Sequence, residues 1–318
     1  MKQKIYFRAD AGQNIGYGHF IRTLALADML KNDFDCVFFT QEPSEYQKKE
    51  LEVVCRHVDL PADESRFGKF LDYLTGKEIV VLDNYFYTTN YQCRIKARGC
   101  KLVCIDDMHD KHYVADAVIN HGPVSRDDFD CELYTKLCLG NQWSLLRKPF
   151  LEPIKSTTRE KKIVVCFGGA DPQHLTDNVV SMLLNMNVPY DIVVVLGDTA
   201  YLSEDNQEKV EIKRKLSAQQ MAELFETASI GILPSSTVRL EAVSRGLKVI
   251  CGYFVENQQI GFERSLSWKD ILPIYSYNEL TEDKLKQALL DIEHFTFTIP
   301  DYVHIPDSYI KLMNSLYD

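Results

Sequence analysis

The sequence lacks paired cysteines of the kind that bind metal or form a disulfide framework. Its nine cysteines are an odd number, and none of them forms a Cys-x-x-Cys pair. This pattern argues against a zinc ribbon and against a fold held by disulfides. Scattered free thiols fit a reducing compartment best, so we expect a cytoplasmic protein.

Long apolar runs and an excess of positive charge are also missing. No stretch approaches the roughly 18–20 residues that span a bilayer, and Met1–Asp10 is too short and too polar for a signal peptide. The 36 Lys and Arg residues stand against 46 Asp and Glu residues, which gives a net charge of −10. This balance argues against nucleic acid or an anionic membrane as the main partner. We expect neither a nucleic-acid partner nor a membrane span, and the composition leaves the oligomeric state open.

The remaining composition is that of a globular protein. Hydrophobic residues make up 45% of the chain and charged residues 26%, which supplies a large core. A length of 318 residues is about twice that of a usual domain. From its length alone, we therefore expect the chain to form either two domains or one large domain.

Apolar runs alternate with helical patterns along the chain, which predicts parallel sheets covered on both faces. The expected strands are Lys4–Phe7, Cys36–Phe39, Ile79–Leu82, Leu102–Ile105, Ala117–Ile119, Ile163–Phe167, Ile192–Leu196, Ile230–Leu233 and Lys248–Cys251. The expected helices include His19–Leu30, Leu175–Leu184, Ala218–Thr227 and Val238–Arg245.

The alternation starts twice, so we expect two α/β domains. One covers residues 1–150 and the other residues 160–290, with a linker that contains Pro149, Pro153 and the polar stretch Lys155–Lys162. Residues 291–318 form a helical tail that could pack on either domain. Ligands of open α/β sheets bind outside the carboxyl ends of the strands, so the residues that follow strands are the candidates for a site.

The first such segment is Arg8–Arg22, which places Gly16 and Gly18 in a turn before a helix. The glycines allow a close approach of the backbone, and the free N–H groups of the helix can receive negative charge. His19 would lie at this helix N-terminus, where the dipole disfavours imidazolium, so it should be neutral near pH 7 and able to act as a base. The alternative is an ordinary turn in which the histidine caps or packs. The segment is not the dinucleotide fingerprint, because Ile21 stands at the third glycine position.

Two further segments also join a strand to a helix. Gly168 and Gly169, followed by Asp171, could hold a diphosphate or a sugar hydroxyl, or Asp171 could simply start the helix. The small hydroxyl residues of the other segment could hold a phosphate, and Glu241 could accept the hydroxyls of a ribose. Its alternative is a helix cap with an exposed glutamate. The hydroxyl residues are Ser235, Ser236 and Thr237.

Three other polar segments follow strands. Tyr85 could orient water or a sugar, or it could be a half-buried interface tyrosine. Asn257 and Gln258 open a helix and could line a site or cap that helix. Asp106–His112 could be read as a metal cluster, but a short polar loop does not bring ligands to one point, so we favour a structural loop.

These segments together resemble the UDP-2,4-diacetamido-2,4,6-trideoxy-β-L-altropyranose hydrolases of pseudaminic acid biosynthesis. The matching positions cover roughly residues 1–275, and the N-terminal segment is the most specific of them. The other segments recur across the glycosyltransferase-B superfamily. The matches are Arg8-x-Asp10, Ile15-Gly16-x-Gly18-His19-x-x-Arg22-x-Leu24-x-Leu26-Ala27, Gly168-Gly169-x-Asp171, Leu175-Thr176, Ser235-Ser236-Thr237, Glu241-Ala242 and Asn257-Gln258.

The resemblance implies two Rossmann-like domains in a glycosyltransferase-B arrangement, with a cleft between them. It implies hydrolysis of the UDP-sugar by water, with inversion at the anomeric carbon and without a metal or another cofactor. His19 would be the general base or would orient the water, and Tyr85 would lie near that water. The residues that would bind the substrate are Gly16, Gly18, Arg22, Gly168, Gly169, Asp171, Ser235, Ser236, Thr237, Glu241, Asn257 and Gln258. Two positions depart from the family pattern, namely His174, in place of a polar amide, and Asn84, in place of a histidine.

The residues alone leave other functions open. A glycosyltransferase of the same fold would pass the sugar from UDP to an acceptor other than water. A non-catalytic protein would bind the UDP-sugar without turning it over. The hydrolase is the interpretation that we favour, because a neutral histidine is a suitable base for water at pH 7 and UDP is a good leaving group.

Overall fold

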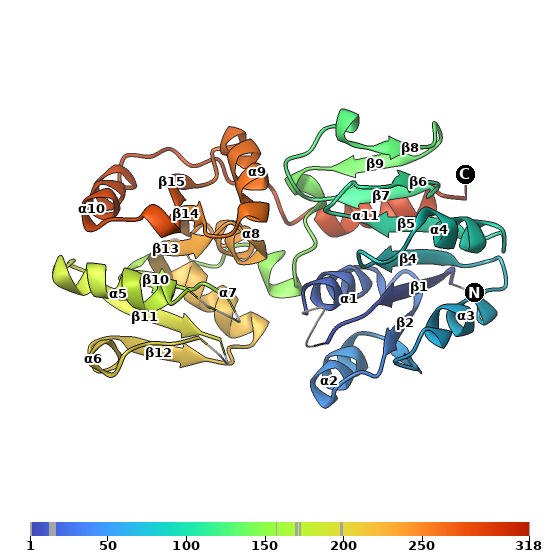
Figure 1. Ribbon diagram of the computed structural model, residues 1–318, viewed down its shortest axis with the longest axis horizontal. Helices are drawn as coiled ribbons and strands as arrows, with labels where there is room; N and C mark the ends of the chain where they lie inside the picture. Colours follow the sequence, from blue (N-terminus) through green and yellow to red (C-terminus); the bar gives the residue numbers. More distant parts are fainter. Residues whose placement is uncertain are drawn as a thin grey trace. The chain divides into compact units, whose positions relative to one another are not determined.

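The computed structural model describes residues 2–12, 17–156, 158–168, 171, 173–197 and 200–317, except for the side chain of Asn257. The chain forms two compact units (Figure 1). Unit 1 consists of Met1–Lys148 and Val303–Asp318, and unit 2 consists of Pro149–Tyr302. The chain therefore starts in unit 1, passes through unit 2 and returns to unit 1.

Unit 1 is built on a parallel sheet of seven strands in the order β3-β2-β1-β4-β5-β7-β9. A second, two-stranded sheet pairs β6 with β8. The strands are β1 (Lys4–Ala9), β2 (Asp35–Gln41), β3 (Arg56–Leu60), β4 (Ile79–Asp83), β5 (Lys101–Ile105), β6 (His112–Tyr113), β7 (Ala117–Asn120), β8 (Asp130–Cys131) and β9 (Lys136–Leu139).

Helices cover both faces of this sheet (Figure 1). Tyr6 belongs to a core cluster with Phe70 of α3 and Ile95 of α4, whereas its neighbour Phe7 stacks on Phe38, which in turn contacts Phe20 of α1. Successive side chains of a strand point to opposite faces, so β1 is apolar on both sides. The helices are α1 (Gly18–Leu30), α2 (Glu45–Val54), α3 (Ser65–Asp72), α4 (Thr89–Lys96) and α11 (Ile305–Asn314).

Unit 2 repeats the architecture with a parallel sheet of six strands in the order β12-β11-β10-β13-β14-β15. On one face, α5 and α10 share a core with Ile163 and Val165. The strands are β10 (Glu160–Val165), β11 (Asp191–Leu196), β12 (Glu211–Arg214), β13 (Ala228–Pro234), β14 (Lys248–Tyr253) and β15 (Leu272–Ser276). The helices are α5 (Leu175–Asn185), α6 (Glu204–Gln207), α7 (Ala218–Thr227), α8 (Thr237–Ser244), α9 (Glu256–Ser265) and α10 (Glu282–Asp291).

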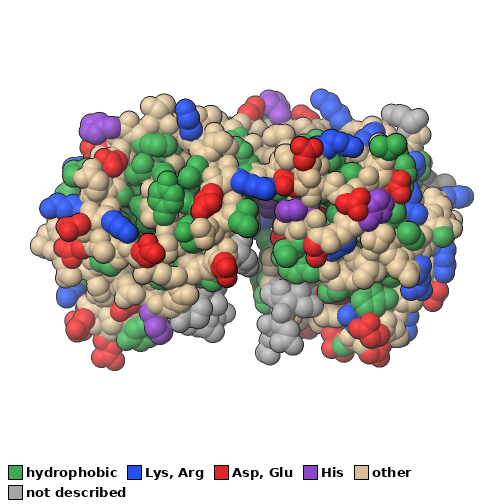
Figure 2. Space-filling model, turned by 45° about the horizontal axis from the view of Figure 1, so that its top comes forward, with side chains coloured by type: hydrophobic (Ala, Val, Ile, Leu, Met, Phe, Trp, Pro, Cys, Tyr) green, Lys and Arg blue, Asp and Glu red, His purple; other side chains and the backbone are tan. Residues whose placement is uncertain are grey.

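Each unit is thus a doubly wound, Rossmann-like α/β unit, and the prediction of parallel sheets is confirmed. The structure places the C-terminal helix α11 in unit 1, whereas α10 belongs to unit 2. Figure 2 shows acidic side chains lying among basic ones on the face that it draws. Among the described residues, no helix is both long and apolar enough to cross a membrane.

Candidate active site

The carboxyl edge of the unit 1 sheet carries a connected set of polar side chains. His19 is the second residue of α1, directly after the turn that follows β1, and its ring is buried. Asp83 is the last residue of β4, which lies next to β1 in the sheet. The Nδ1 atom of His19 lies 2.7 Å from Oδ1 of Asp83. The pairing of β1 with β4 therefore brings together two residues that are 64 positions apart in the chain.

This contact fixes the proton of the imidazole. An ionised carboxylate can only accept a hydrogen bond, so Nδ1 of His19 carries the proton and donates it to Asp83. Arg22 Nη2 also lies 3.1 Å from this nitrogen, but a guanidinium has only donors and cannot accept the Nδ1 proton. In the neutral ring Nε2 is consequently the unprotonated nitrogen, which is the atom that a general base needs.

Asp83 remains ionised although it is fully buried. Its carboxylate accepts hydrogen bonds from Arg22 Nε and Nη2, both at 2.6 Å, and from Thr23 Oγ1 at 2.8 Å, in addition to His19. Burial acts to raise the pKa of Asp83, but the charge of Arg22 and these hydrogen bonds outweigh it and lower the pKa below its ordinary value. The charge that orients His19 is therefore present at neutral pH.

Tyr85 lies against His19 at the same sheet edge. The two rings meet edge to face with their centroids 4.5 Å apart. The Tyr85 hydroxyl donates to Oδ2 of Asp107 over 3.2 Å, and Arg22 Nη1 donates to the same oxygen over 2.9 Å. The described hydrogen bonds of the Arg22 guanidinium thus go to carboxylates of the protein, which makes it a clamp within the site.

A second polar network joins the ends of strands β1, β2 and β4 at the same edge of the sheet. Arg8 forms an ion pair with Asp10, with Nη2 of Arg8 2.7 Å from Oδ2, and Asp10 also accepts from the backbone N–H of Gln41. The side chain of Asn84 bonds to both the backbone N–H and the carbonyl of Asp10. The Arg8-x-Asp10 motif therefore ties together the ends of β1, β2 and β4, and Asn84 has a structural role in the same network.

The glycine turn of unit 2 follows β10. Gly168 has a φ of +91°, a conformation that favours glycine, and a Cβ there would meet no described atom within 4 Å. Asp171 accepts from the backbone N–H groups of Leu175 and Thr176, over 2.9 and 2.7 Å, and so caps α5. Gly169, like Gly16 of the first turn, lies outside the described residues. Gly18 is described as the exposed first residue of α1.

The hydroxyl residues lie at the end of β13, which is the neighbour of β10 in the sheet. Ser236 is the cap residue of α8, and its side chain and that of Thr237 are exposed. Among the described residues, the hydroxyls of Ser235, Ser236 and Thr237 have no hydrogen-bond partner, so they can bind a ligand at a helix N-terminus. Glu241 lies one turn further along α8 and is buried.

Helix α9 follows β14, the next strand of the same sheet. Gln258 accepts from the backbone N–H of Phe254 over 3.4 Å, which ties the helix to the preceding loop. The backbone of Asn257 lies in the first turn of α9, and its side chain is outside the description.

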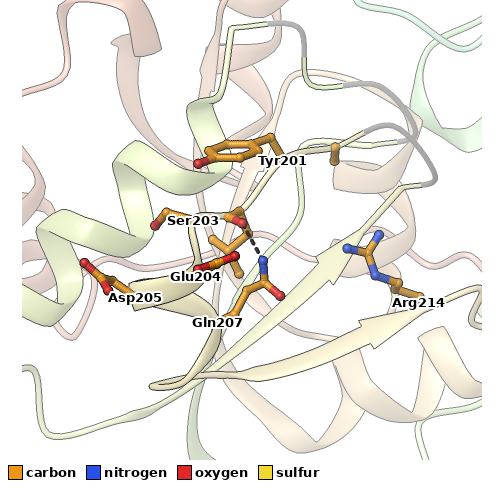
Figure 3. A pocket seen from close by; sticks show the side chains of 8 residues that line it. Tyr201, Ser203, Glu204, Asp205, Gln207 and Arg214 are labelled. Atoms are coloured by element: carbon orange, nitrogen blue, oxygen red, sulfur yellow. Dashed lines mark hydrogen bonds between the residues drawn. The ribbon is translucent and has the colours of Figure 1, made fainter.

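Sequence reasoning did not identify a cavity at the carboxyl ends of β11 and β12 (Figure 3). It has a volume of about 570 Å³, which is within the range of ligand sites. Its lining includes Tyr201, Ser203, Gln207 and Arg214, and Arg214 Nη1 donates to the carbonyl of Gly197 over 3.1 Å. The lining residues follow strands, which could have indicated a site, but β12 has no apolar run by which the sequence would have revealed this strand.

The sequence also failed to reveal that Asp83 contacts His19 and that Asp107 contacts Tyr85. For the Asp106–His112 segment, the structure shows a loop in which Asp106 Oδ2 accepts from the backbone N–H of His109 over 2.6 Å. In the described part of the chain, no group of three or more His, Cys, Asp or Glu side chains is placed to hold a metal ion.

Comparison with curated proteins finds two related chains. The sequence is 26% identical over 278 residues to the uncharacterised protein MJ1062 of Methanocaldococcus jannaschii, a match that covers 80% of this chain and 57% of that protein. The chain thus spans little more than half the length of this relative. It is 24% identical over 282 residues to the UDP-2,4-diacetamido-2,4,6-trideoxy-beta-L-altropyranose hydrolase of Campylobacter jejuni, covering 80% of this chain and 93% of the hydrolase. No protein-family model matches the chain.

Comparison with solved structures finds glycosyltransferases of the same fold. MurG of Acinetobacter baumannii has a TM-score of 0.66 and 10% identity, covering 100% of this chain and 99% of MurG. UGT2 of Phytolacca americana, complexed with UDP-2fluoro-glucose and pterostilbene, has a TM-score of 0.62 and 10% identity, covering 99% and 100%. UGT89C1 of Arabidopsis thaliana, complexed with UDP, has a TM-score of 0.63 and 11% identity, covering 100% and 96%. These likenesses confirm the glycosyltransferase-B fold class, and the Campylobacter match confirms the resemblance to the hydrolase.

Proposed function

We propose that this chain hydrolyses UDP-2,4-diacetamido-2,4,6-trideoxy-β-L-altropyranose to UDP and the free sugar, as a step of pseudaminic acid biosynthesis. The likeness to the Campylobacter hydrolase, which extends over 80% of this chain, supports the substrate. The observation that carries the chemistry is the 2.7 Å contact between His19 Nδ1 and Asp83, because it leaves Nε2 as a base.

In the proposed reaction, water attacks the anomeric carbon while Nε2 of His19 takes one of its protons. The C–O bond to UDP breaks, and its electron pair stays on the departing β-phosphate. A single displacement of this kind inverts the anomeric configuration. The imidazolium that forms is stabilised by the ionised Asp83, which continues to accept the Nδ1 proton.

Unit 2 supplies the groups that would bind UDP. The exposed hydroxyls of Ser236 and Thr237, together with the N–H groups at the start of α8, are donors for the diphosphate. Gly168 allows a close backbone approach in the neighbouring turn, and Glu241 is the residue that we assign to the ribose hydroxyls. The cavity of Figure 3 lies further along the same sheet edge and has room for the base. Because these donors can take up the charge of the leaving group, we propose that the reaction needs no metal.

A glycosyltransferase is the second candidate, and the fold favours it. The solved structures that match this fold include UGT2, over 99% of the chain, and UGT89C1, over 100% of it. The same base would then deprotonate a hydroxyl of an acceptor instead of water. The two functions differ in whether UDP release depends on an acceptor.

The test is incubation of the protein with UDP-linked diacetamido-trideoxy hexoses, with UDP release and the anomeric configuration followed by NMR. We expect release with water alone, an inverted product, and unchanged rates after treatment with a chelator. His19→Ala should lower turnover by about 10²–10⁴-fold and leave UDP binding in calorimetry intact. The matched control is His294→Ala, which changes an exposed histidine of unit 2.

Three results would contradict this proposal. Release that requires a carbohydrate or lipid acceptor would identify a transferase. Tight binding of the UDP-sugar without turnover would identify a binding protein. Near-normal turnover by a folded His19→Ala protein would remove this residue from the mechanism.

A further inference from the structure

Asp107 lies next to the proposed catalytic residues but comes from a different strand end. It follows β5, whereas Asp83 ends β4 and His19 follows β1, and these three strands are neighbours in the order β1-β4-β5. Its carboxylate is 38% exposed, so it reaches the surface of this sheet edge. One oxygen, Oδ2, accepts hydrogen bonds from both Arg22 Nη1 and the Tyr85 hydroxyl.

The contact with Asp107 determines where the hydroxyl proton of Tyr85 points. A tyrosine hydroxyl has one proton to donate, and an ionised carboxylate can only accept. The proton of Tyr85 is therefore directed to Asp107, and the lone pairs of the phenolic oxygen remain available to a third group. Burial and the charge of Asp107 raise the pKa of Tyr85 to about 12, so the hydroxyl is protonated at neutral pH.

His19 is arranged in the same way by a different carboxylate. Its Nδ1 proton is directed to Asp83, and Nε2 is left as an acceptor. The rings of His19 and Tyr85 contact each other edge to face. The sheet edge thus presents two hydrogen-bond acceptors, each with its own proton held by a separate aspartate.

We propose that Asp107 is a positioning residue that holds the hydroxyl proton of Tyr85, so that Tyr85 and His19 both act as acceptors toward the attacking water. This inference rests on the proposed hydrolysis. A water that donates one hydrogen to each acceptor keeps its lone pairs free for the anomeric carbon. One O–H bond breaks toward Nε2 as the new C–O bond forms, and the hydrogen that faces Tyr85 remains on the product hydroxyl. A donating Tyr85 would instead occupy a lone pair of the nucleophile.

Arg22 links the two aspartates, because its guanidinium donates to Asp83 and to Asp107. A change at Asp107 could therefore reach His19 through Arg22 and Asp83 without involving Tyr85. The two routes make different predictions. If Asp107 acts through Tyr85, its removal costs little once the Tyr85 hydroxyl is gone, whereas the route through Arg22 does not depend on that hydroxyl.

The test is a double-mutant cycle of Asp107→Asn and Tyr85→Phe, with UDP release measured from the UDP-sugar that the wild-type protein hydrolyses. Each single variant should lower kcat by about 10–100-fold, with KM and the UDP affinity from calorimetry unchanged. The double variant should be about as slow as Tyr85→Phe alone. Asp110→Asn is the matched control, because the exposed Asp110 forms an ion pair with Lys111 in the same loop, and it should retain wild-type kcat. Equal losses from Asp107→Asn in both backgrounds would overturn the proposal in favour of the route through Arg22.

A second readout needs no substrate and separates this inference from the proposed function. Tyrosine labelled with ¹³C at Cζ reports ionisation of Tyr85 by NMR. We expect the Tyr85 signal to titrate at a lower pH in Asp107→Asn than in the wild-type protein, because the carboxylate that holds its proton is gone. An unchanged titration would refute the contact. If no UDP-sugar is hydrolysed, the proposed function fails and with it the role of the water, while the titration still decides whether Asp107 holds the Tyr85 proton.

Discussion

His19 can act as a base because Asp83 decides which of its nitrogens carries the proton. Without this partner an imidazole at a helix N-terminus could hold its proton on either nitrogen. Asp83 is itself held by hydrogen bonds from Arg22 and Thr23. The orientation of the His19 ring therefore depends on these three side chains together. The proposed catalytic role therefore depends on the whole set of side chains and not on the histidine alone.

We predict that Asp83→Asn loses both activity and stability. The amide cannot neutralise the buried Arg22, which keeps only the partly exposed Asp107 as a charged partner, and breaking a buried ion pair costs about 3–5 kcal/mol. Turnover should fall by about 100-fold or more, because an amide can donate to Nδ1 and so favour the wrong tautomer. Urea unfolding and kcat measure the two effects. Asp35→Asn is the control, since Asp35 pairs with Arg56 near the surface and should cost no more than about 1 kcal/mol. Equal destabilisation by the two variants would contradict the buried-pair argument.

The same carboxylates predict acid sensitivity. Burial acts to raise the pKa values of Asp83 and Asp107, but the charge of Arg22 outweighs it and lowers both. The folded protein then binds fewer protons than the unfolded chain just below about pH 4, so stability rises with pH in this window. The stabilisation is present above the unfolded pKa and is lost as the pH falls through the folded values. Urea midpoints measured from pH 6 downward should fall less steeply for Asp107→Asn than for the wild-type protein, and equal slopes would argue against this linkage.

The strands that were predicted from the sequence and those that were not differ in their position in the two large sheets. The nine predicted strands correspond to β1, β2, β4, β5, β7, β10, β11, β13 and β14, which are all interior strands. The four edge strands of the two large sheets, β3, β9, β12 and β15, were not predicted. Interior strands of a parallel sheet are buried on both faces and read as continuous apolar runs. An edge strand such as β12, with the sequence Glu211–Arg214, is partly solvated and carries charges.

In the candidate site, features made by neighbouring residues could be predicted from the sequence, whereas contacts between distant residues could not. The turns before α1, α5 and α8 are visible in sequence because glycines and small hydroxyl residues directly follow apolar runs. The partnership of His19 with Asp83 is not visible, because it depends on β4 lying beside β1. Asp171 was expected either to start α5 or to line a ligand site, and the structure shows that its carboxylate accepts from two backbone N–H groups of this helix.

We predict that Gly252→Ala in β14 displaces the neighbouring segment of Ser235, Ser236 and Thr237 in unit 2. A Cβ at this position in β14 would clash with the carbonyl oxygen of Tyr275 and would lie 3.1 Å from the ring of Tyr277. The backbone carbonyl of Gly252 also accepts from the N–H of Ser235 over 2.8 Å. We expect a loss of about 1–3 kcal/mol in urea unfolding and a weaker affinity for UDP in calorimetry.

The control for this prediction is Gly68→Ala in helix α3 of unit 1. A Cβ there would meet nothing within 4 Å, and alanine is the better helix former by about 0.5–1 kcal/mol. This variant should be slightly stabilised, with UDP affinity unchanged. A Gly252→Ala protein as stable as Gly68→Ala would show that β15 can move aside.

The path of the chain makes the C-terminal helix a part of unit 1. Helix α11 contacts α1, and the Tyr309 hydroxyl donates to the backbone carbonyl of Trp143. Lys136 of β9 donates to the carbonyl of Ser315 over 2.9 Å. The apolar face of α11, which includes Ile305, Leu312 and Met313, is buried. Unit 1 is therefore closed by residues that follow the whole of unit 2.

We predict that Met313→Ala weakens unit 1 in the region of α1. Met313 is fully buried, and its truncation should cost about 2–5 kcal/mol. Hydrogen exchange should show faster exchange of the amides of α1, because this helix contacts α11. Asn314→Ala, at the exposed neighbouring position, should leave that exchange unchanged. Unaltered protection of α1 in Met313→Ala would mean that α11 contributes little to this unit.

The return of the chain through α11 also sets an order for synthesis. A ribosome releases residues 1–148 first, but the segment that completes this unit, Val303–Asp318, emerges only after unit 2. Domains generally fold in the order in which they are translated, yet here the N-terminal sheet must wait, with an apolar surface uncovered, until the entire second unit has been made. The nascent polypeptide is thus the form of this protein in which that surface most needs protection by a chaperone.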